Sequence, residues 1–296
     1  MMKQSASITL QGRRIRCLLF DLGETLWIHC DQATMERITE QQARQCATLL
    51  QTYIPALPPS ISDYYQWSVQ LRQAISERYQ AWRYQDYEQE PDPILVTAQA
   101  CQDASLPLLE RTQLAYLFET FRPPLAAARI LLDGALETLQ VLRTHGMLLG
   151  CVTDRWYGGL PFREDLRRLG LLEYFAPEAI IVSADCGKRK PHPIPFCQAM
   201  TALNVSAEET AVVGDFLSRD IAGAKRLQMT AIWKPKERLL QQVSMSCQGL
   251  QQEDLLHAAR YEEETMYPEV PFSILEPFLQ PDAIIKNVTE LLSLLT

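Results

Sequence analysis

Short apolar runs that stop abruptly at a polar residue or a glycine restrict the fold of this chain more than any other feature. The first run ends at Asp21, as a buried parallel strand does at the edge of a sheet. The runs cover residues 15–20, 147–152, 179–182, 210–213 and 229–233. Helical patterns lie between them and cover residues 134–145, 161–169, 194–203 and 219–227. This alternation predicts an α/β fold in which a parallel sheet is covered by helices on both faces.

A different pattern between residues 29 and 126 predicts an inserted, all-helical domain. Long amphipathic stretches rich in Gln, Arg and Tyr replace the apolar runs there, and prolines mark the breaks between them. The predicted helices are residues 35–53, 67–85, 94–102 and 108–121. Residues 1–28 and 127–296 then form one discontinuous α/β core around the helical domain of residues 29–126.

The segment after the fifth run has no clear period. Residues 235–280 contain several prolines and an acidic run at Glu262 to Glu264, and we interpret them as a peripheral excursion from the core. Residues 281–295 carry apolar side chains at helical spacing. This spacing predicts that the chain closes on its sheet with a terminal helix.

The charge balance and the apolar content argue against several classes of partner. Among 296 residues, 28 Lys and Arg stand against 36 Asp and Glu, and a net charge of -8 argues against nucleic acid or an anionic membrane surface. No apolar run approaches the roughly 18 residues of a membrane span, and the first residues lack the apolar stretch of a signal peptide. We therefore expect a cytoplasmic protein whose 8 cysteines, which contain no C-x-x-C pair, are reduced thiols.

Polar residues that suit phosphate chemistry stand close to the ends of the apolar runs. They are Asp21, Thr153, Lys190, Asp215 and Asp220. Because the carboxyl ends of the strands of an open parallel sheet converge on one crevice, residues far apart in the chain can meet there. Paired carboxylates suit a hard cation such as Mg²⁺, and a lysine and a threonine hydroxyl can hold the oxygens of a phosphoryl group. One aspartate is then free to attack phosphorus.

Each of these residues also has an ordinary structural explanation. An aspartate after a strand is often the cap of the next helix, and Lys188 to Lys190 would usually be a solvated basic turn. Their order along the chain, each near the end of an apolar run and followed by a helix, favours one shared site. Neither G-x-G-x-x-G nor G-x-x-x-x-G-K-[ST] occurs, so dinucleotide and phosphate-loop sites have no support in the sequence.

The segments LLFDLGETL, CVTD, GKRKPHPIPF and VVGDFLSRDIAGAKRL together resemble the haloacid dehalogenase superfamily. Most of its members are Mg²⁺-dependent phosphatases that have a Rossmann-like core and act through an aspartyl-phosphate intermediate. The resemblance implies that Asp21 is the nucleophile, that Thr153 and Lys190 are catalytic residues that bind the phosphate, and that Asp215 and Asp220 are the acidic metal-binding pair. It also implies that the insertion is the helical cap of the phosphoglycolate phosphatase-like and dehalogenase-like branch, which closes over the substrate.

One departure from that family bears directly on activity. The residue two positions after the nucleophile is usually an aspartate that serves the phosphatases as general acid and base, and here it is Gly23. The backbone carbonyl of this position can still serve as a metal ligand, so the implied metal set is Asp21, Gly23, Asp215 and Asp220. Loss of general acid and base help typically costs about 10²- to 10⁴-fold in rate, which predicts a slow enzyme.

A second departure places an additional charge beside the expected phosphate site. Asp154 follows Thr153 where relatives often carry Asn, and Arg155 is the neighbouring residue that could offset this charge. Two interpretations of Asp154 stay open at this stage: it contacts the phosphate of the substrate, or it belongs to the structure of the loop.

Three functions are compatible with these residues. The first is a Mg²⁺-dependent phosphatase of a small phosphorylated metabolite, slowed by Gly23. The second, which Gly23 favours, is a catalytically weak or inactive binding or regulatory protein with the phosphatase architecture. The third is a haloacid dehalogenase, which also lacks the second aspartate and needs no metal. Asp215 and Asp220 argue against it, because two acids without a cation would repel an anionic substrate. The individual substrate and the oligomeric state are open at this stage.

Overall fold

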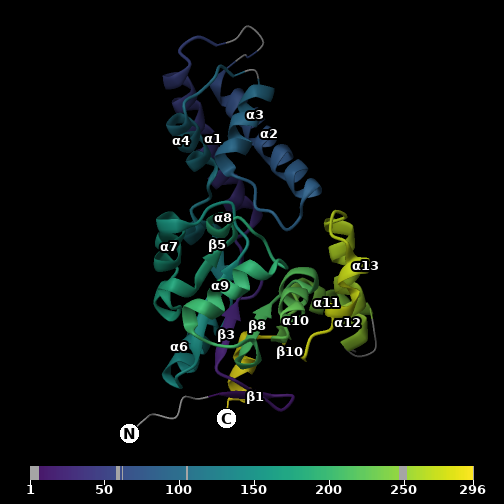
Figure 1. The fold of residues 1–296 in the computed structure, drawn as a ribbon. Helices are drawn as coiled ribbons and strands as arrows, with labels where there is room; N and C mark the ends of the chain where they lie inside the picture. The colour runs from purple at the N-terminus through teal and green to yellow at the C-terminus, as the bar shows by residue number, and fades with distance from the viewer. Residues whose placement is uncertain (1–6, 58–60, 62, 105, 247–251, 296) are drawn as a thin grey trace. The chain divides into compact units, whose positions relative to one another are not determined.

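The computed structural model describes residues 7–57, 61, 63–104, 106–246 and 252–295, and these form two compact units (Figure 1). The chain passes from the first unit to the second after Ile28 and returns after Ile130. The sequence pattern places this return at residue 126. The chain instead continues past that point into a short helix, α5 (Leu125–Ala128), which packs on α1 of the second unit.

The first unit is built on a six-stranded parallel sheet with the strand order β10-β9-β8-β3-β6-β7. The strands are β3 (Cys17–Phe20), β6 (Leu148–Thr153), β7 (Ile180–Val182), β8 (Thr210–Gly214), β9 (Thr230–Trp233) and β10 (Ala283–Ile284). The four residues of β3 are fully buried. Because successive side chains of a strand point to opposite faces, both faces of the sheet are covered there. The predicted α/β fold is confirmed, and five of the six strands are the five apolar runs.

Helices follow the strands of this unit in alternation. They are α6 (Ala135–Thr144), α7 (Gly159–Arg168), α8 (Ser183–Cys186), α9 (Pro193–Leu203), the π-helical turn η4 (Leu217–Ile221) and α10 (Ala222–Arg226), with short 3₁₀ turns at η1 (Leu172–Tyr174), η2 (Pro177–Ala179) and η3 (Ala207–Glu209). The sequence sets the ends of α9 clearly. His192 Nδ1 accepts the N–H of Ile194 at 3.2 Å, and Pro193 stands at the first position, where a helix needs no N–H donor. Asn204 ends the helix in a left-handed conformation.

The last residues agree only in part with the terminal helix predicted over residues 281–295. Strand β10 pairs in parallel with β9, and a 3₁₀ helix, η6 (Val288–Leu294), follows it. Two of the apolar side chains that suggested a helix, Val288 and Leu291, are buried, and they lie on this 3₁₀ helix. The backbone donors and acceptors at the edge of β9 explain the strand, because pairing with β10 satisfies them.

A hairpin at the other end of the chain lies outside the predicted elements. It consists of β1 (Ile8–Leu10) and β2 (Arg13–Ile15), which pair antiparallel. The two residues of its turn, Gln11 and Gly12, have positive φ angles of 49° and 78°. This conformation gives a two-residue turn whose twist matches that of the strands.

The segment interpreted as a peripheral excursion is helical in its described part. It contains α11 (Glu237–Ser246), α12 (Gln252–Met266), α13 (Phe272–Leu275) and the 3₁₀ turn η5 (Glu276–Phe278). Helix α12 packs on α11 and on η4, so the segment reaches the turn that follows β8. Of the helices in the described part of the chain, none combines the length and the apolar character that a membrane crossing requires.

The second unit is a group of helices, as predicted for the insertion. They are α1 (Gln32–Tyr53), α2 (Tyr64–Gln85), α3 (Pro93–Asp103) and α4 (Arg111–Phe121). Aspartates cap the first three: Asp31, Asp63 and Asp92 each accept a backbone N–H of the first helical turn. The chain enters and leaves through β4 (Trp27–His29) and β5 (Arg129–Leu131), which pair with each other.

Candidate active site

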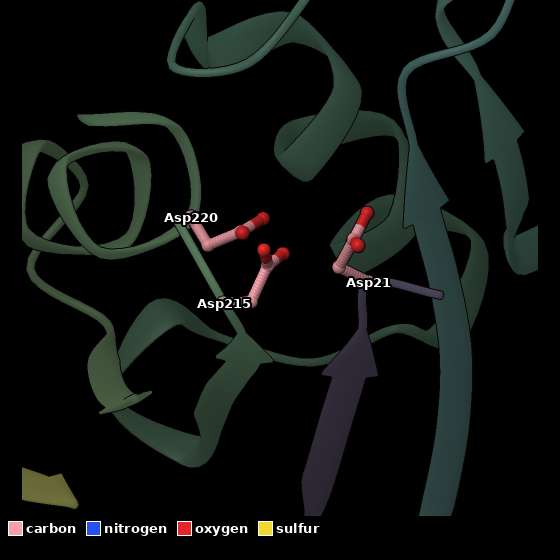
Figure 2. A group of neighbouring side chains, drawn as sticks. All are labelled: Asp21, Asp215 and Asp220. Carbon is pink, nitrogen blue, oxygen red and sulfur yellow. The ribbon is translucent and has the colours of Figure 1, made fainter. Parts of the chain in front are cut away.

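Three aspartates meet at the carboxyl ends of β3 and β8 (Figure 2). Asp21 directly follows β3, Asp215 directly follows β8, and Asp220 lies on η4. One carboxylate oxygen of each lies within 4.8 Å of the other two, and all three residues are buried. The pairing of β3 with β8 explains this arrangement, because residues that follow neighbouring parallel strands arrive at the same edge of the sheet.

Lys190 joins two of these aspartates. Its Nζ donates hydrogen bonds to Asp21 Oδ1 and to Asp220 Oδ1, each at 2.6 Å, and to the carbonyl oxygen of Val152 at 3.0 Å. The side chain is only 3% exposed, so the three N–H groups of the ammonium are satisfied inside the protein. A solvated basic turn therefore does not describe this lysine.

Thr153 and Asp154 follow each other at the end of β6, the strand beside β3. Thr153 is the last residue of the strand and is buried. Asp154 Oδ1 accepts the backbone N–H of Lys190 at 3.1 Å, and its Oδ2 lies 3.7 Å from the guanidinium of Arg189. The guanidinium of Arg155 lies over three aromatic rings instead. These contacts favour a structural role for Asp154, which holds the segment that carries Lys190.

Burial and mutual repulsion shift the proton equilibria of the cluster. Desolvation raises the pKa of Asp21 to about 6, although the attraction of Lys190 lowers it. Desolvation, followed by the charges of Asp21 and Asp220, raises the pKa of Asp215 well above its usual range. Burial alone would lower the pKa of Lys190, but the neighbouring carboxylates outweigh it and raise this pKa above its usual range. Without a cation beside them, Asp21 and Asp215 therefore hold their protons more tightly than isolated carboxyl groups do.

A divalent cation fits this arrangement. Both carboxylate oxygens of Asp215 are buried and accept no hydrogen bond from the described residues. When ionised, the three aspartates carry three negative charges, and Lys190 supplies one positive charge. Lys236 approaches Asp215 only to 3.9 Å and is shared with Glu262, so negative charge remains in excess. A hard cation that prefers oxygen ligands, such as Mg²⁺, would satisfy both the oxygens and the charge. Asp21, Asp215 and Asp220 could hold it, and the sequence adds the backbone carbonyl of Gly23 to this set.

The turn after Asp21 has room for a side chain at Gly23. A Cβ atom built there would lie 3.9 Å from Asp21 Oδ2 and 4.0 Å from Trp27 Nε1, which are ordinary contact distances. The left-handed residue of this turn is Glu24, with a φ of 56°, and Lys234 Nζ donates to its carbonyl oxygen at 2.7 Å. Backbone geometry therefore does not require a glycine at position 23, and the missing carboxylate is a chemical difference.

The sequence patterns do not identify the charged residues that contact the cluster from the segment after β9. Lys236 Nζ lies 3.9 Å from Asp215 Oδ2 and 2.8 Å from Glu262 Oε1. Glu263, the next residue on α12, accepts hydrogen bonds from the start of η4. Helical spacing is the one sequence signal that points to Glu263. This residue follows Leu255, which is buried, by about two helical turns, so both lie on the same face of α12.

Part of the chain matches a known protein family. The model of the family described as haloacid dehalogenase-like hydrolase matches residues 104–234. The matched stretch includes Thr153, Lys190, Asp215 and Asp220, whereas Asp21 and α12 lie outside it. The family pattern therefore covers four of the five polar residues that the sequence singled out.

Curated relatives match the same part of the chain. Glyceraldehyde 3-phosphate phosphatase of Pyrococcus furiosus is 40% identical over 102 residues, which are 34% of this chain and 40% of that protein. Phosphoserine phosphatase of Thermus thermophilus is 34% identical over 93 residues, which are 31% of this chain and 35% of that protein. The chain thus spans about two fifths or less of the length of these two relatives.

Solved structures extend the likeness to nearly the whole chain. The 2-haloacid dehalogenase of Pseudomonas syringae pv. tomato has a TM-score of 0.56 and 24% identity, and the match covers 95% of this chain and 97% of that one. The HAD phosphatase of Thermococcus onnurineus has a TM-score of 0.51 and 20% identity, with 94% and 97% covered. At these identities the likeness establishes the fold alone. The chain therefore matches the haloacid dehalogenase-like hydrolase family over residues 104–234, and it has the fold of the two solved structures over nearly its whole length.

Proposed function

We propose that this protein is a Mg²⁺-dependent phosphatase of a small phosphorylated metabolite and that it acts through a phosphorylated Asp21. The observation that carries the proposal is the buried cluster in which Asp21 and Asp220 share Lys190, while neither carboxylate oxygen of Asp215 accepts a hydrogen bond from the described part of the chain. The relatives named phosphatases of glyceraldehyde 3-phosphate and of phosphoserine support the substrate class. Because these two names differ in substrate, they support a class and no individual metabolite.

Asp21 is the nucleophile of the proposed reaction. One of its carboxylate oxygens attacks phosphorus, so that an acyl phosphate bond forms while the bond from phosphorus to the alcohol oxygen breaks. Lys190 and Thr153 would hold the non-bridging oxygens of the phosphoryl group. When bound to the three aspartates, Mg²⁺ would neutralise charge between the carboxylate and the phosphoryl group. Water then attacks the phosphorus of the aspartyl phosphate, which releases inorganic phosphate and restores Asp21.

Gly23 makes both steps slow in this proposal. The departing alcohol takes up a proton and the attacking water loses one, but no carboxylate stands two residues after Asp21 to transfer these protons. Substrates whose leaving groups need little protonation, such as aryl and acyl phosphates, should therefore react best. The aspartyl phosphate should also accumulate, because no aspartate at position 23 activates the water.

Hydrolysis of para-nitrophenyl phosphate with and without Mg²⁺ tests the proposal. We expect the wild type to release phosphate only with Mg²⁺, and the Asp21→Asn variant, which lacks the nucleophile, to release none. Intact-mass measurement should show one added phosphoryl group on the wild type and none on this variant. A wild type that neither releases phosphate nor becomes phosphorylated by any of several phosphate donors would contradict the proposed phosphatase.

A catalytically inactive binding or regulatory protein is the second candidate, because Gly23 removes the usual proton-transfer group. In that case Mg²⁺ and a phosphate mimic should bind without turnover, and the Gly23→Asp variant should show no more activity than the wild type. Robust hydrolysis by the wild type would exclude this candidate.

A further inference from the structure

A buried glutamate from α12 holds the start of η4, the turn that carries Asp220. Glu263 is only 2% exposed. Its Oε1 accepts the backbone N–H of Leu217 at 2.7 Å, and its Oε2 accepts the backbone N–H of Ser218 at 2.9 Å as well as the hydroxyl of Ser218. Both oxygens of this carboxylate are therefore committed to the first two residues of η4.

These hydrogen bonds replace a missing helix cap. The first N–H groups of a helix have no partner inside the helix, and an N-cap side chain usually accepts one or two of them. Phe216 stands at the N-cap of η4 and makes no such bond. Glu263 accepts from two of these N–H groups instead, and its negative charge lies at the favourable end of the helix dipole.

The cap also completes the hydrogen bonding of the turn between two site residues. Asp220 Oδ2 accepts the N–H of Phe216 at 3.0 Å. Together with the two bonds to Glu263, this means that carboxylates hold three successive backbone N–H groups between Asp215 and Asp220. A turn held at three successive residues has little freedom to change the separation of Asp215 from Asp220.

Packing alone does not explain a carboxylate at position 263, because burial of a charged group costs free energy. Burial disfavours the charged form of Glu263 and raises the pKa of this carboxyl above its ordinary value. A nonpolar side chain of similar volume would pack against a protein interior at lower cost. The residue type is therefore better explained by the N–H groups that it holds than by packing.

We propose that Glu263 is a positioning residue that fixes the turn from Asp215 to Asp220 in the geometry that binds the metal ion. The inference rests on the proposed function, because it takes Asp215 and Asp220 as ligands of Mg²⁺. Groups that orient metal ligands typically contribute 10- to 100-fold to metal affinity. Removal of the Glu263 carboxylate should therefore weaken Mg²⁺ binding by about 10- to 100-fold, although no ligand is changed.

Isothermal titration calorimetry of Mg²⁺ into the metal-free, full-length protein tests this inference without reliance on activity. In the Glu263→Gln variant, an amide NH₂ replaces one oxygen and cannot accept from the backbone of η4. Glu264→Gln is the matched control, because Glu264 is the next residue on α12 and forms only a half-exposed ion pair with Arg260, at 2.8 Å. We expect this control to bind Mg²⁺ within about twofold of the wild type.

Melting temperatures of the metal-free proteins separate positioning from general stabilisation. A purely structural role would lower the melting temperature of Glu263→Gln and leave the Mg²⁺ affinity of the folded protein unchanged. If Glu263→Gln does not fold, the Glu263→Asp variant tests the positioning role instead. Its carboxylate is one methylene too short to reach both N–H groups, so Mg²⁺ binding should weaken by a smaller factor.

The possible failures are distinguishable. A folded Glu263→Gln or Glu263→Asp variant that binds Mg²⁺ as tightly as the wild type would overturn the positioning role and leave the proposed phosphatase intact. A wild type that binds no Mg²⁺ would remove the proposed metal-dependent function, and the positioning role with it.

Discussion

The turn after Asp21 has a glycine, Gly23, at a position with room for a side chain. The next residue, Glu24, has the left-handed backbone that favours glycine. Space around Gly23 is open and its backbone is not left-handed, whereas Glu24 has a φ of 56°. Left-handed backbone costs most residues about 1–2 kcal/mol, and glycine adopts it freely. Because one residue lacks a functional group and the other bears backbone strain, chemistry and stability can be tested separately within the same turn.

Substitution of Gly23 by aspartate should raise the turnover of the proposed phosphatase. The new carboxylate would stand two residues after Asp21, where it can protonate the leaving alcohol and activate water. General acid and base catalysis typically contributes about 10²- to 10⁴-fold, so we expect kcat for an alkyl phosphate to rise by a factor in this range. The gain for para-nitrophenyl phosphate should be smaller, because its leaving group needs little protonation.

The Gly23→Asn variant is the control for this prediction. Asparagine has the size of aspartate and fits the same space, but it transfers no proton at neutral pH. Steady-state kinetics of both variants should therefore show a rise for aspartate only. Equal rates for Gly23→Asp and the wild type on an alkyl phosphate would mean that the missing carboxylate does not limit turnover.

Substitution of Glu24 by glycine should stabilise the first unit. Relief of the left-handed strain gains about 1–2 kcal/mol, and the greater freedom of glycine in the unfolded chain costs about 0.5–1 kcal/mol, so a net gain of roughly 0.5–1 kcal/mol is expected. The hydrogen bond from Lys234 is retained, because it is made to the backbone. Urea denaturation measures the change in the free energy of unfolding.

Gln228→Gly is the comparison for this substitution, since Gln228 also has a positive φ, 60°, and precedes β9, at the amino end of a strand rather than at the carboxyl ends that carry the acidic cluster. Similar stabilisation by both glycines would assign the gain to backbone strain. A loss of stability in Glu24→Gly alone would show instead that the Glu24 side chain makes contacts worth more than the strain.

At the level of elements, the sequence predicts what its local patterns encode. The strands and the helices of the alternating core follow from apolar runs and helical spacing, because a doubly covered sheet needs runs such as Cys17–Phe20 without polar interruption. The convergence of Asp21 with Asp215 also follows, since it depends only on the ends of parallel strands. The contact with Glu263 does not, because it depends on how α12 packs against a turn 45 residues away in the chain.

The end of the chain illustrates the same limit. Residues 281–295 have helical spacing, yet Ala283 and Ile284 pair with β9 and the 3₁₀ helix begins only at Val288. The spacing of apolar residues indicates which side chains are buried. The backbone conformation that buries them depends on the edge of β9, whose free N–H and C=O groups favour pairing with a further strand. Such tertiary effects are not encoded in a single short window of sequence.

Helix α1 of the second unit offers a test of its cap. Asp31 accepts the backbone N–H of Thr34 at 2.9 Å and its hydroxyl at 2.8 Å, and these hydrogen bonds hold the pKa of Asp31 below its ordinary value. Asp31→Ala should therefore loosen the first turn of α1, with amide exchange there on the order of fivefold faster. Hydrogen exchange of peptides from this turn measures the effect at neutral pH.

The lowered pKa of Asp31 also fixes the direction of a pH effect. A carboxyl whose pKa is lower in the folded state stabilises that state above its unfolded pKa of about 3.9 and loses this contribution as the pH falls through the folded pKa. Asp31→Asn keeps an equally good cap that does not titrate. Below about pH 4, the first turn of α1 should therefore lose less protection from hydrogen exchange in Asp31→Asn than in the wild type. Equal losses in the two proteins would show that Asp31 is not the source of the pH effect.

For the whole molecule, the division into two units predicts where a metal ion acts. The acidic cluster lies entirely in the first unit, at the ends of β3 and β8 and on η4. The second unit has buried side chains of its own, such as Trp67 and Leu71 on α2. A ligand that binds the folded form of the first unit should stabilise the elements that unfold with that unit, and the four helices of the second need not respond.

Addition of Mg²⁺ should therefore protect the two units unequally. At a concentration 100 times its Kd, the ion should stabilise the first unit by about 2.7 kcal/mol, which slows exchange of its most protected amides by up to about 100-fold. Peptides from β3 and β8 should show this change, peptides from α1 and α2 should not, and chelation of the metal should reverse it. Asp215→Asn should abolish the effect, because both carboxylate oxygens of Asp215 lack a hydrogen-bond donor among the residues that the structure describes. Equal protection of both units by Mg²⁺ would instead show that they unfold as one cooperative body, since the ligand would then stabilise amides far from its own site.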